Sequence, residues 1–292
     1  MEHKAGFVNI IGNPNVGKST LMNALTGEKL SIITSKAQTT RHRILGIVNG
    51  KDFQVIYSDT PGILEPNYKL QESMMGFVHE ALDDADVFLV VVDATDKNGP
   101  DPKAIERIKK KNVPVIVVLN KMDVAKGEDL MKQADRWSKE LKGADVVPVS
   151  ALRHTNTDRV FDLVLKYLPE HPAYYDKEEI TDRNERFFVA EIIREKILKN
   201  YQKEIPYASE VAVEAFKEDE RMIRINATVF VERESQKAII IGHRGAALKK
   251  LGTEARLSIE HFLGKKVFLD LFVKVDKDWR NNEGKLKKFG YR

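Results

Sequence analysis

Short Val- and Ile-rich runs that alternate with amphipathic stretches restrict the fold of this 292-residue chain more than any other feature. The runs span residues 7–11, 53–57, 87–92, 113–119 and 146–149. Strands covered by helices on both faces need such uninterrupted runs, because neither face meets water. Residues 43–49 lead through a short Gly-containing turn into the second run, which predicts one antiparallel edge hairpin. The fold class predicted for residues 1–170 is therefore α/β, with a doubly wound and mostly parallel sheet.

The alternation stops near residue 170, where two prolines and a charged stretch predict a linker over residues 171–184. A helical pattern at residues 186–201 comes next. Two strands with period-two alternation, a helical region broken by glycines and a last alternating strand complete the chain. Residues 185–292 therefore predict a second, α+β domain with the order helix, strand, strand, helix, helix, strand, followed by a basic tail.

Charge is unevenly distributed along the chain. The net charge is +4, but residues 235–292 carry 14 Lys and Arg against 6 Asp and Glu, a net +8. A solvated surface explains any single lysine, whereas this concentration makes an anionic partner an equal alternative. The chain has no cysteine, which excludes disulfides and thiolate metal sites. No apolar run is long enough to cross a bilayer, and no apolar signal segment precedes the first strand, so we expect a cytoplasmic protein.

Residues 12–19 read GNPNVGKS between a predicted strand and a predicted helix, which is the setting of a phosphate-binding loop. Backbone N–H groups and the positive helix end would hold the β-phosphate. Lys18 suits the β- and γ-phosphates, and the hydroxyl of Ser19 suits Mg²⁺. A Gly-rich turn with a surface lysine is the alternative, and it loses weight because further motifs follow. The predicted residues are Gly12, Asn13, Pro14, Asn15, Val16, Gly17, Lys18, Ser19 and Thr20.

Three more loops follow predicted strands, at the edge where doubly wound sheets bind ligands. In the first, Asp59 suits Mg²⁺ through water and Gly62 offers an N–H to a γ-phosphate. In the second, the Asp123 carboxylate accepts two N–H bonds from guanine that adenine does not offer, so it selects the base. In the third, a backbone N–H suits the guanine O6 atom. The predicted residues are Asp59, Thr60, Pro61, Gly62, Ile63, Asn120, Lys121, Met122, Asp123, Ser150, Ala151 and Leu152.

The chain also resembles a known family. The phosphate loop with Asn15 in its middle, the run SKAQTTRHR at residues 35–43 and the DTPG sequence at residues 59–62 resemble the Era family of P-loop GTPases, which act in bacterial ribosome assembly. The second domain, with IIGHRG at residues 240–245, resembles the KH domain of the same family. The resemblance implies GTP hydrolysis to GDP and phosphate with Mg²⁺ held by Ser19, Thr40 and, through water, Asp59. It places Thr40 on an exposed, mobile switch loop, residues 28–43, whose central residues are Gln38, Thr39, Thr40, Arg41 and His42.

Position 63, where many P-loop GTPases have a glutamine that orients water, holds Ile63. One interpretation is a slow, switch-like enzyme. The resemblance implies another, in which a K⁺ ion held partly by Asn15 spreads charge near the β–γ bridge.

The GxxG loop of KH domains clamps a single-stranded sugar–phosphate backbone. Here its interior pair is His243-Arg244, where the family more often has Lys or Arg with Gly. The residues expected at RNA are Ile241, Gly242, His243, Arg244, Gly245, Lys249 and Lys250. The resemblance implies a monomer that binds the 3′ end of small-subunit (16S) rRNA and the 30S subunit, with peripheral association at the cytoplasmic face of the inner membrane. Two alternatives remain: a second domain that docks to proteins or lipid, and an RNA-modifying enzyme, for which the second domain shows no catalytic residues.

Overall fold

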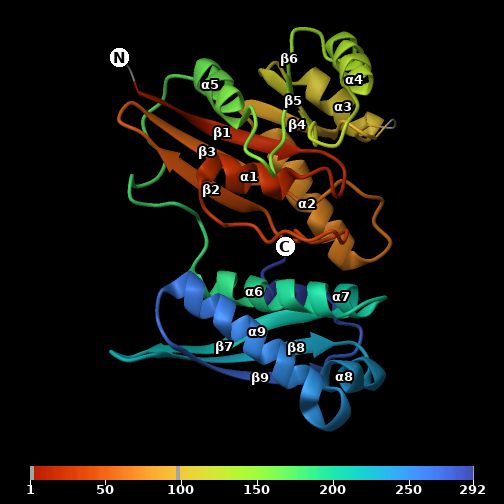
Figure 1. The fold of residues 1–292 in the computed structure, drawn as a ribbon, viewed down its shortest axis with the longest axis vertical. Coiled ribbons are helices and arrows are strands. Elements are labelled where there is room, and N and C mark those ends of the chain that lie inside the picture. The colour runs from red at the N-terminus through yellow and green to blue at the C-terminus, as the bar shows by residue number, and fades with distance from the viewer. Residues whose placement is uncertain (1–2, 97–98, 292) are drawn as a thin grey trace. The chain divides into compact units, whose positions relative to one another are not determined.

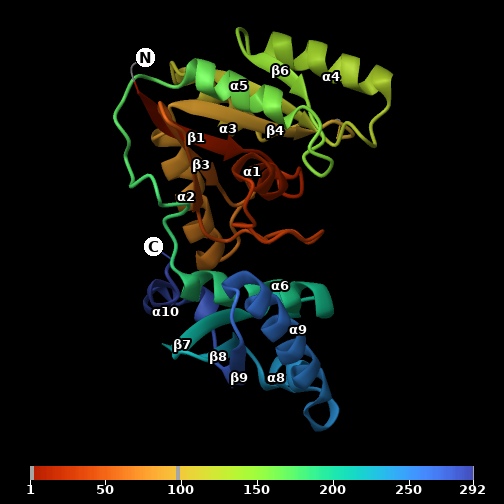
Figure 2. The same ribbon diagram turned by 60° about the vertical axis from the view of Figure 1, so that its left-hand side comes forward.

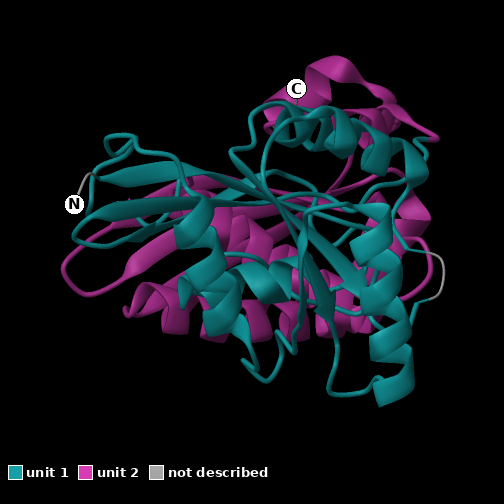
Figure 3. Cartoon of the chain, turned by 90° about the horizontal axis from the view of Figure 1, so that it is seen from above, with its two compact units in different colours: residues 1–66, 74–182 teal, residues 67–73, 183–292 magenta. Residues whose placement is uncertain are grey.

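The computed structural model describes residues 3–96 and 99–291 and divides the chain into two compact units. Figure 3 colours them separately: residues 1–66 and 74–182 form the first unit, and residues 67–73 and 183–292 form the second. The predicted linker therefore belongs, up to residue 182, to the first unit.

Residues 3–96 and 99–182 form a six-stranded sheet and five helices, all in the first unit except for the start of one helix, whose residues 69–73 belong to the second. The strands are β1 (Lys4–Ile11), β2 (Ile44–Asn49), β3 (Phe53–Asp59), β4 (Val87–Asp93), β5 (Val115–Asn120) and β6 (Asp145–Pro148). The helices are α1 (Lys18–Thr26), α2 (Lys69–Asp83), α3 (Pro102–Lys110), α4 (Gly127–Glu140) and α5 (Thr157–Tyr167). The strand order is β2-β3-β1-β4-β5-β6 (Figure 1). β2 pairs antiparallel with β3, and the other neighbours pair parallel, which confirms the predicted sheet and its edge hairpin.

Helices cover both faces of this sheet. α1 and α5 contact each other on one face, and α2 and α3 lie on the opposite face (Figure 2). Between them, residues 87–92 of β4 are all buried, as a strand without a solvent face requires. Because the carboxyl ends of parallel strands meet at one edge, the loops after β1, β3, β5 and β6 gather there.

The predicted linker packs along β2. The N–H of Ile47 donates to the carbonyl of Ile180 at 2.9 Å, in the manner of a further strand. Gln54, fully buried, accepts hydrogen bonds through its side-chain oxygen from the backbone N–H groups of Tyr174 (2.7 Å) and Tyr175 (3.0 Å). The edge of β2 is therefore covered, and this stretch of chain has a fixed course.

The described part of the second unit, up to residue 291, contains a three-stranded sheet whose strands share one hydrophobic core with helices. The helices are α6 (Glu185–Asn200), α7 (Ile205–Ala208), α8 (Glu234–Ile241), α9 (Ala246–Leu263) and α10 (Glu283–Lys288), with 3₁₀ turns η1 (His243–Gly245) and η2 (Trp279–Asn281). The strands are β7 (Glu210–Glu218), β8 (Ile223–Val231) and β9 (Val267–Val275). β8 is central, antiparallel to β7 and parallel to β9. The predicted order is confirmed, and α7, η2 and α10 are additions to it.

The predicted basic tail is folded. Trp279 is fully buried and donates its indole N–H to the carbonyl of Ala208 at 3.0 Å. Tyr291, also buried, donates its hydroxyl to the carboxylate of Glu210 at 2.7 Å. Two aromatic side chains thus fix the segment to the rest of the unit. In the part of the chain that the structure describes, no helix is both long and apolar enough to cross a membrane.

Candidate functional site

The loop between β1 and α1 has the backbone of a phosphate-binding loop. Gly17 has a φ of 96°, and a Cβ atom there would lie 2.2 Å from the side-chain nitrogen of Asn120, so only glycine fits. Asn15 also has a positive φ, 63°, in the left-handed region that a non-glycine residue adopts at a cost. α1 starts at Lys18, so its positive end faces the loop.

Lys18 is buried inside this loop. Its Nζ atom donates to the carbonyl oxygens of Gly12 at 3.0 Å and Asn13 at 2.8 Å. Burial lowers the pKa of the Lys18 ammonium to about 8, against the opposing effect of the Asp59 carboxylate. Phosphate oxygens are a stronger partner for an ammonium than two carbonyls, so a bound nucleotide would raise this pKa again.

Three hydroxyl and carboxyl groups converge next to Lys18. Ser19 Oγ lies 2.9 Å from Thr40 Oγ1, and it donates to Asp59 Oδ2 at 2.7 Å. Thr40 Oγ1 reaches the same carboxyl oxygen at 3.4 Å. Thr40 is only 8% exposed, so the expectation of an exposed residue was wrong: the switch loop folds inward and covers it.

These groups fit a magnesium ion. Mg²⁺ prefers oxygen ligands and keeps several of its waters. The second carboxyl oxygen, Asp59 Oδ1, is buried and has no hydrogen-bond partner among residues 3–96 and 99–291, so it is available to a metal-bound water. Burial raises the pKa of this carboxyl, while the hydrogen bond from Ser19 and the charge of Lys18 oppose the shift. A cation would oppose it further.

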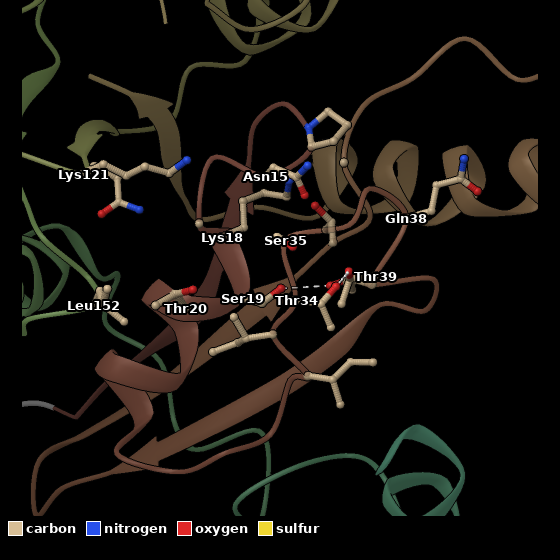
Figure 4. Close-up of a pocket in the computed structure, with 18 of the residues that line it drawn as sticks. Asn15, Lys18, Ser19, Thr20, Thr34, Ser35, Gln38, Thr39, Lys121 and Leu152 are labelled. Carbon is tan, nitrogen blue, oxygen red and sulfur yellow. Dashed lines mark hydrogen bonds between the residues drawn. The ribbon is translucent and has the colours of Figure 1, made fainter. Parts of the chain in front are cut away.

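Hydrogen bonds hold the switch loop, residues 28–43, for which the sequence predicted an exposed and mobile chain. Asn23, on α1, accepts through its side-chain oxygen from the N–H groups of Leu30 (3.1 Å) and Ser31 (2.9 Å). Further along, Thr34 and Thr39 bond through their hydroxyls at 2.7 Å. Figure 4 shows these two threonines beside Ser19, in the same pocket. The loop therefore closes one side of the site, and its start is anchored to the phosphate-site helix.

The predicted base loop is held by Asn120. Its amide nitrogen donates to the carbonyl of Val16 at 2.8 Å, and its amide oxygen accepts the N–H of Ala151 at 3.0 Å. One side chain thus joins the phosphate loop, its own loop and the loop after β6. Lys121 lies at the pocket wall (Figure 4), with its Nζ 2.6 Å from Asp93 Oδ2. Asp123 lines the same pocket.

Together these loops line an open pocket of about 490 Å³, a size that suits a nucleotide. Fifteen of the predicted residues line it: Pro14, Asn15, Gly17, Lys18, Ser19, Thr20, Gln38, Thr39, Thr40, Thr60, Gly62, Asn120, Lys121, Asp123 and Leu152. Five lining residues were not predicted: Ile32, Ile33, Thr34, Ser35 and Val124. The predicted switch residues Arg41 and His42 are buried and do not line this pocket. The His42 ring packs against the ring of Phe77, with 5.9 Å between the ring centroids.

In the second unit, the GxxG sequence forms a tight turn between α8 and α9. Gly242 has a φ of 70°, and a Cβ atom there would lie 2.6 Å from that of Ala247. Arg244 also has a positive φ, 49°, and it is exposed together with His243. Lys249, on the first turns of α9, is exposed too. The turn thus presents a bare backbone flanked by basic side chains.

Comparisons with known proteins match both parts of the chain to known families. The family described as 50S ribosome-binding GTPase matches residues 7–121, and the KH domain family matches residues 204–280. The protein named GTPase Era of Staphylococcus haemolyticus (strain JCSC1435) is 45% identical over 292 residues, which are 99% of this chain and 98% of that protein. The protein of the same name from Syntrophus aciditrophicus (strain SB) is 47% identical over 291 residues, 99% of this chain and 95% of that protein.

Two solved structures are similar over 99% of both chains at 41% identity. One is Era in complex with MgGDPNP and nucleotides 1506–1542 of 16S ribosomal RNA, with a TM-score of 0.92. The other is a variant of Aquifex aeolicus Era bound to GDP.AlF4⁻, with a TM-score of 0.93.

Proposed function

This chain belongs to the Era family of GTPases, and we propose that it binds and hydrolyses GTP to control its hold on the 3′ region of 16S rRNA while the small ribosomal subunit is assembled. One observation carries the nucleotide half of the proposal: Ser19, Thr40 and Asp59 meet beside the buried ammonium of Lys18. The RNA half is supported by the exposed GxxG turn and by the similar Era structure in complex with that RNA. The proposed place of action is the cytoplasm, on the 30S subunit.

The site would act on GTP mainly through charge. Phosphoryl transfer spreads negative charge over the γ-phosphate oxygens, and the ammonium of Lys18 and the loop N–H groups would stabilise it. Magnesium would neutralise the β- and γ-oxygens, with Ser19 and Thr40 as ligands and Asp59 holding a water. Ile63 can neither orient water nor carry a proton. We propose instead that a potassium ion near Asn15 spreads the negative charge that develops near the β–γ bridge. Asn15 has a left-handed backbone and lines the pocket, which supports this proposal.

The RNA would lie across the GxxG turn. Because Gly242 and Gly245 carry no Cβ atoms, a sugar–phosphate backbone can approach the main chain closely. Arg244 and Lys249 supply charge for the phosphates, and binding should weaken as salt is added. Exposed Ile239, on α8, offers an apolar surface for an unstacked base.

The test is binding of the full chain to an oligonucleotide of the 16S rRNA 3′ region, with anionic lipid vesicles measured in parallel. Replacing His243 and Arg244 together by Asp should weaken RNA binding by at least ~1–3 kcal/mol, the range for charge-assisted hydrogen bonds. GTP hydrolysis without RNA should be unchanged. The matched control replaces Lys217 and Lys266, exposed elsewhere in the same unit, by Asp.

Loss of RNA binding in the control as well would show that net charge, not the GxxG turn, determines affinity. Full RNA affinity in the His243/Arg244 variant would refute the assigned RNA surface. Vesicle binding that exceeds RNA binding would instead favour peripheral membrane association, through the same basic residues, as the function of the second unit.

A further inference from the structure

Two buried oxygen atoms beside the nucleotide pocket lack hydrogen-bond partners among the residues that the structure describes. They are Asp59 Oδ1 and the hydroxyl oxygen of Ser31. Both residues are almost completely buried, at 0% and 1% exposure. A buried polar group without a partner costs roughly 1–3 kcal/mol, so a protein keeps one mainly where something else satisfies it.

The main chain holds Ser31 firmly in this place. Asn23 accepts the Ser31 N–H at 2.9 Å and donates to the Ser31 carbonyl at 2.8 Å. Asn23 belongs to α1, the helix that also carries Lys18 and Ser19. The position of Ser31 is therefore fixed relative to the phosphate site, although it lies at the start of the switch loop.

The Ser31 hydroxyl lies close to the Asp59 carboxyl. Burial raises the pKa of the Asp59 carboxyl, and the Ser31 hydroxyl is among the groups close enough to oppose that rise. This contact is too long or too bent to satisfy either atom, because Ser31 Oγ and Asp59 Oδ1 both lack a partner with good hydrogen-bond geometry among residues 3–96 and 99–291. Asp59 Oδ2 is already engaged by Ser19 at 2.7 Å, so Oδ1 is the oxygen left for another partner.

A water molecule satisfies both atoms at once, because it can donate to the carboxylate and to the hydroxyl oxygen. Magnesium in nucleotide sites keeps several of its waters and has few protein ligands. We propose that Ser31 is a positioning residue of the magnesium site, which together with Asp59 holds one of the metal-bound waters. The inference rests on the proposed function, since it concerns the metal that accompanies the nucleotide.

The test is release of a fluorescent GDP analogue from the full chain at a series of Mg²⁺ concentrations, ending in excess EDTA. Changes to groups that orient metal-bound ligands typically lower metal affinity about 10–100-fold. For Ser31→Ala we expect the Mg²⁺ concentration that half-suppresses release to rise about 10-fold, with unchanged release in EDTA. Ser31→Thr keeps the hydroxyl and should restore the response.

Ser58→Ala is the matched control. Ser58 is also buried and adjoins Asp59 in β3. Its hydroxyl already accepts a hydrogen bond from Arg43 Nε at 2.7 Å, so we assign it no role in holding the metal-bound water. Its Mg²⁺ response should equal that of the original chain. Thermal unfolding without nucleotide separates folding from binding: Ser31→Ala removes an unsatisfied hydroxyl, so its midpoint should not fall.

Three outcomes would overturn the inference. They are an unchanged Mg²⁺ response in Ser31→Ala, faster release by the same factor in EDTA, and a lower unfolding midpoint that Ser31→Thr does not correct. If the original chain itself shows no Mg²⁺ dependence or does not bind GDP, the proposed function fails, which is a different result.

Discussion

Asn120→Ala tests how the nucleotide pocket is held together. The side chain is 3% exposed and joins the carbonyl of Val16 to the N–H of Ala151 at 2.8 and 3.0 Å. Alanine leaves both groups buried and unpaired, at roughly 1–3 kcal/mol each. Water entering the space beside Gly17 would offset part of this loss. We therefore expect Asn120→Ala to cost about 2–4 kcal/mol of free energy in total, divided between the stability of the first unit and its affinity for nucleotide.

Urea unfolding of the nucleotide-free chain and titration with a fluorescent GDP analogue measure these two parts. Affinity should fall at least about 10-fold, which is about 1.4 kcal/mol. Asn49→Ala is the control, since Asn49 donates to the Glu179 carbonyl at 3.1 Å and accepts from Gln54 Nε2 at 2.8 Å, away from the nucleotide loops. It should cost about 1–3 kcal/mol of stability and leave GDP affinity alone. If Asn120→Ala behaved like this control, the three loops would not depend on Asn120.

Three other expectations concern the same pocket. Asp123→Asn should shift preference from GTP toward XTP by at least about 10-fold in competition binding, because the 2-oxo group replaces the donor that a carboxylate accepts. Nucleotide affinity should be constant below pH 8 and fall as pH rises above it: the pKa of free Lys18 is about 8, so binding must then take up a proton. Calorimetry in two buffers of different ionisation enthalpy checks that uptake, and no uptake at pH 9 would contradict it. Hydrolysis should be faster in KCl than in NaCl at equal ionic strength, and Asn15→Ala should remove the difference; equal rates in both salts would refute the potassium site.

Much of the nucleotide pocket could be predicted from the sequence because its parts are local. Lys18 and Asp123 each follow a continuous apolar run, and the rule for doubly wound sheets brings the ends of such runs to one edge. The structure then places both residues in the pocket lining. Neither step needs knowledge of side-chain packing.

The switch loop could not be predicted in the same way. Its course depends on Asn23, whose side chain bonds to Leu30 and Ser31 seven and eight residues further on. No periodic pattern marks such a contact, and asparagine within a helix is not unusual. The sequence therefore suggested an exposed Thr40, while the anchored loop buries it. The packing of the linker on Gln54 escaped prediction for the same reason, since prolines and charges mark irregular chain but not where it docks.

Charge counted along the sequence also differs from charge available on the surface. Of the basic side chains after residue 235, Lys265 bonds to Glu218 at 2.8 Å and Lys274 to Glu214 at 3.1 Å. Arg280 pairs with Glu232, and Lys285 with Asp276. A lysine held by a carboxylate has less to gain from a phosphate, because it must first give up that partner. Arg244 and Lys249 are exposed and have no ion-pair partner in residues 3–96 and 99–291. Part of the net +8 is therefore neutralised within the unit, whereas an RNA bound at the GxxG turn would meet Arg244 and Lys249, whose charges no described carboxylate pairs.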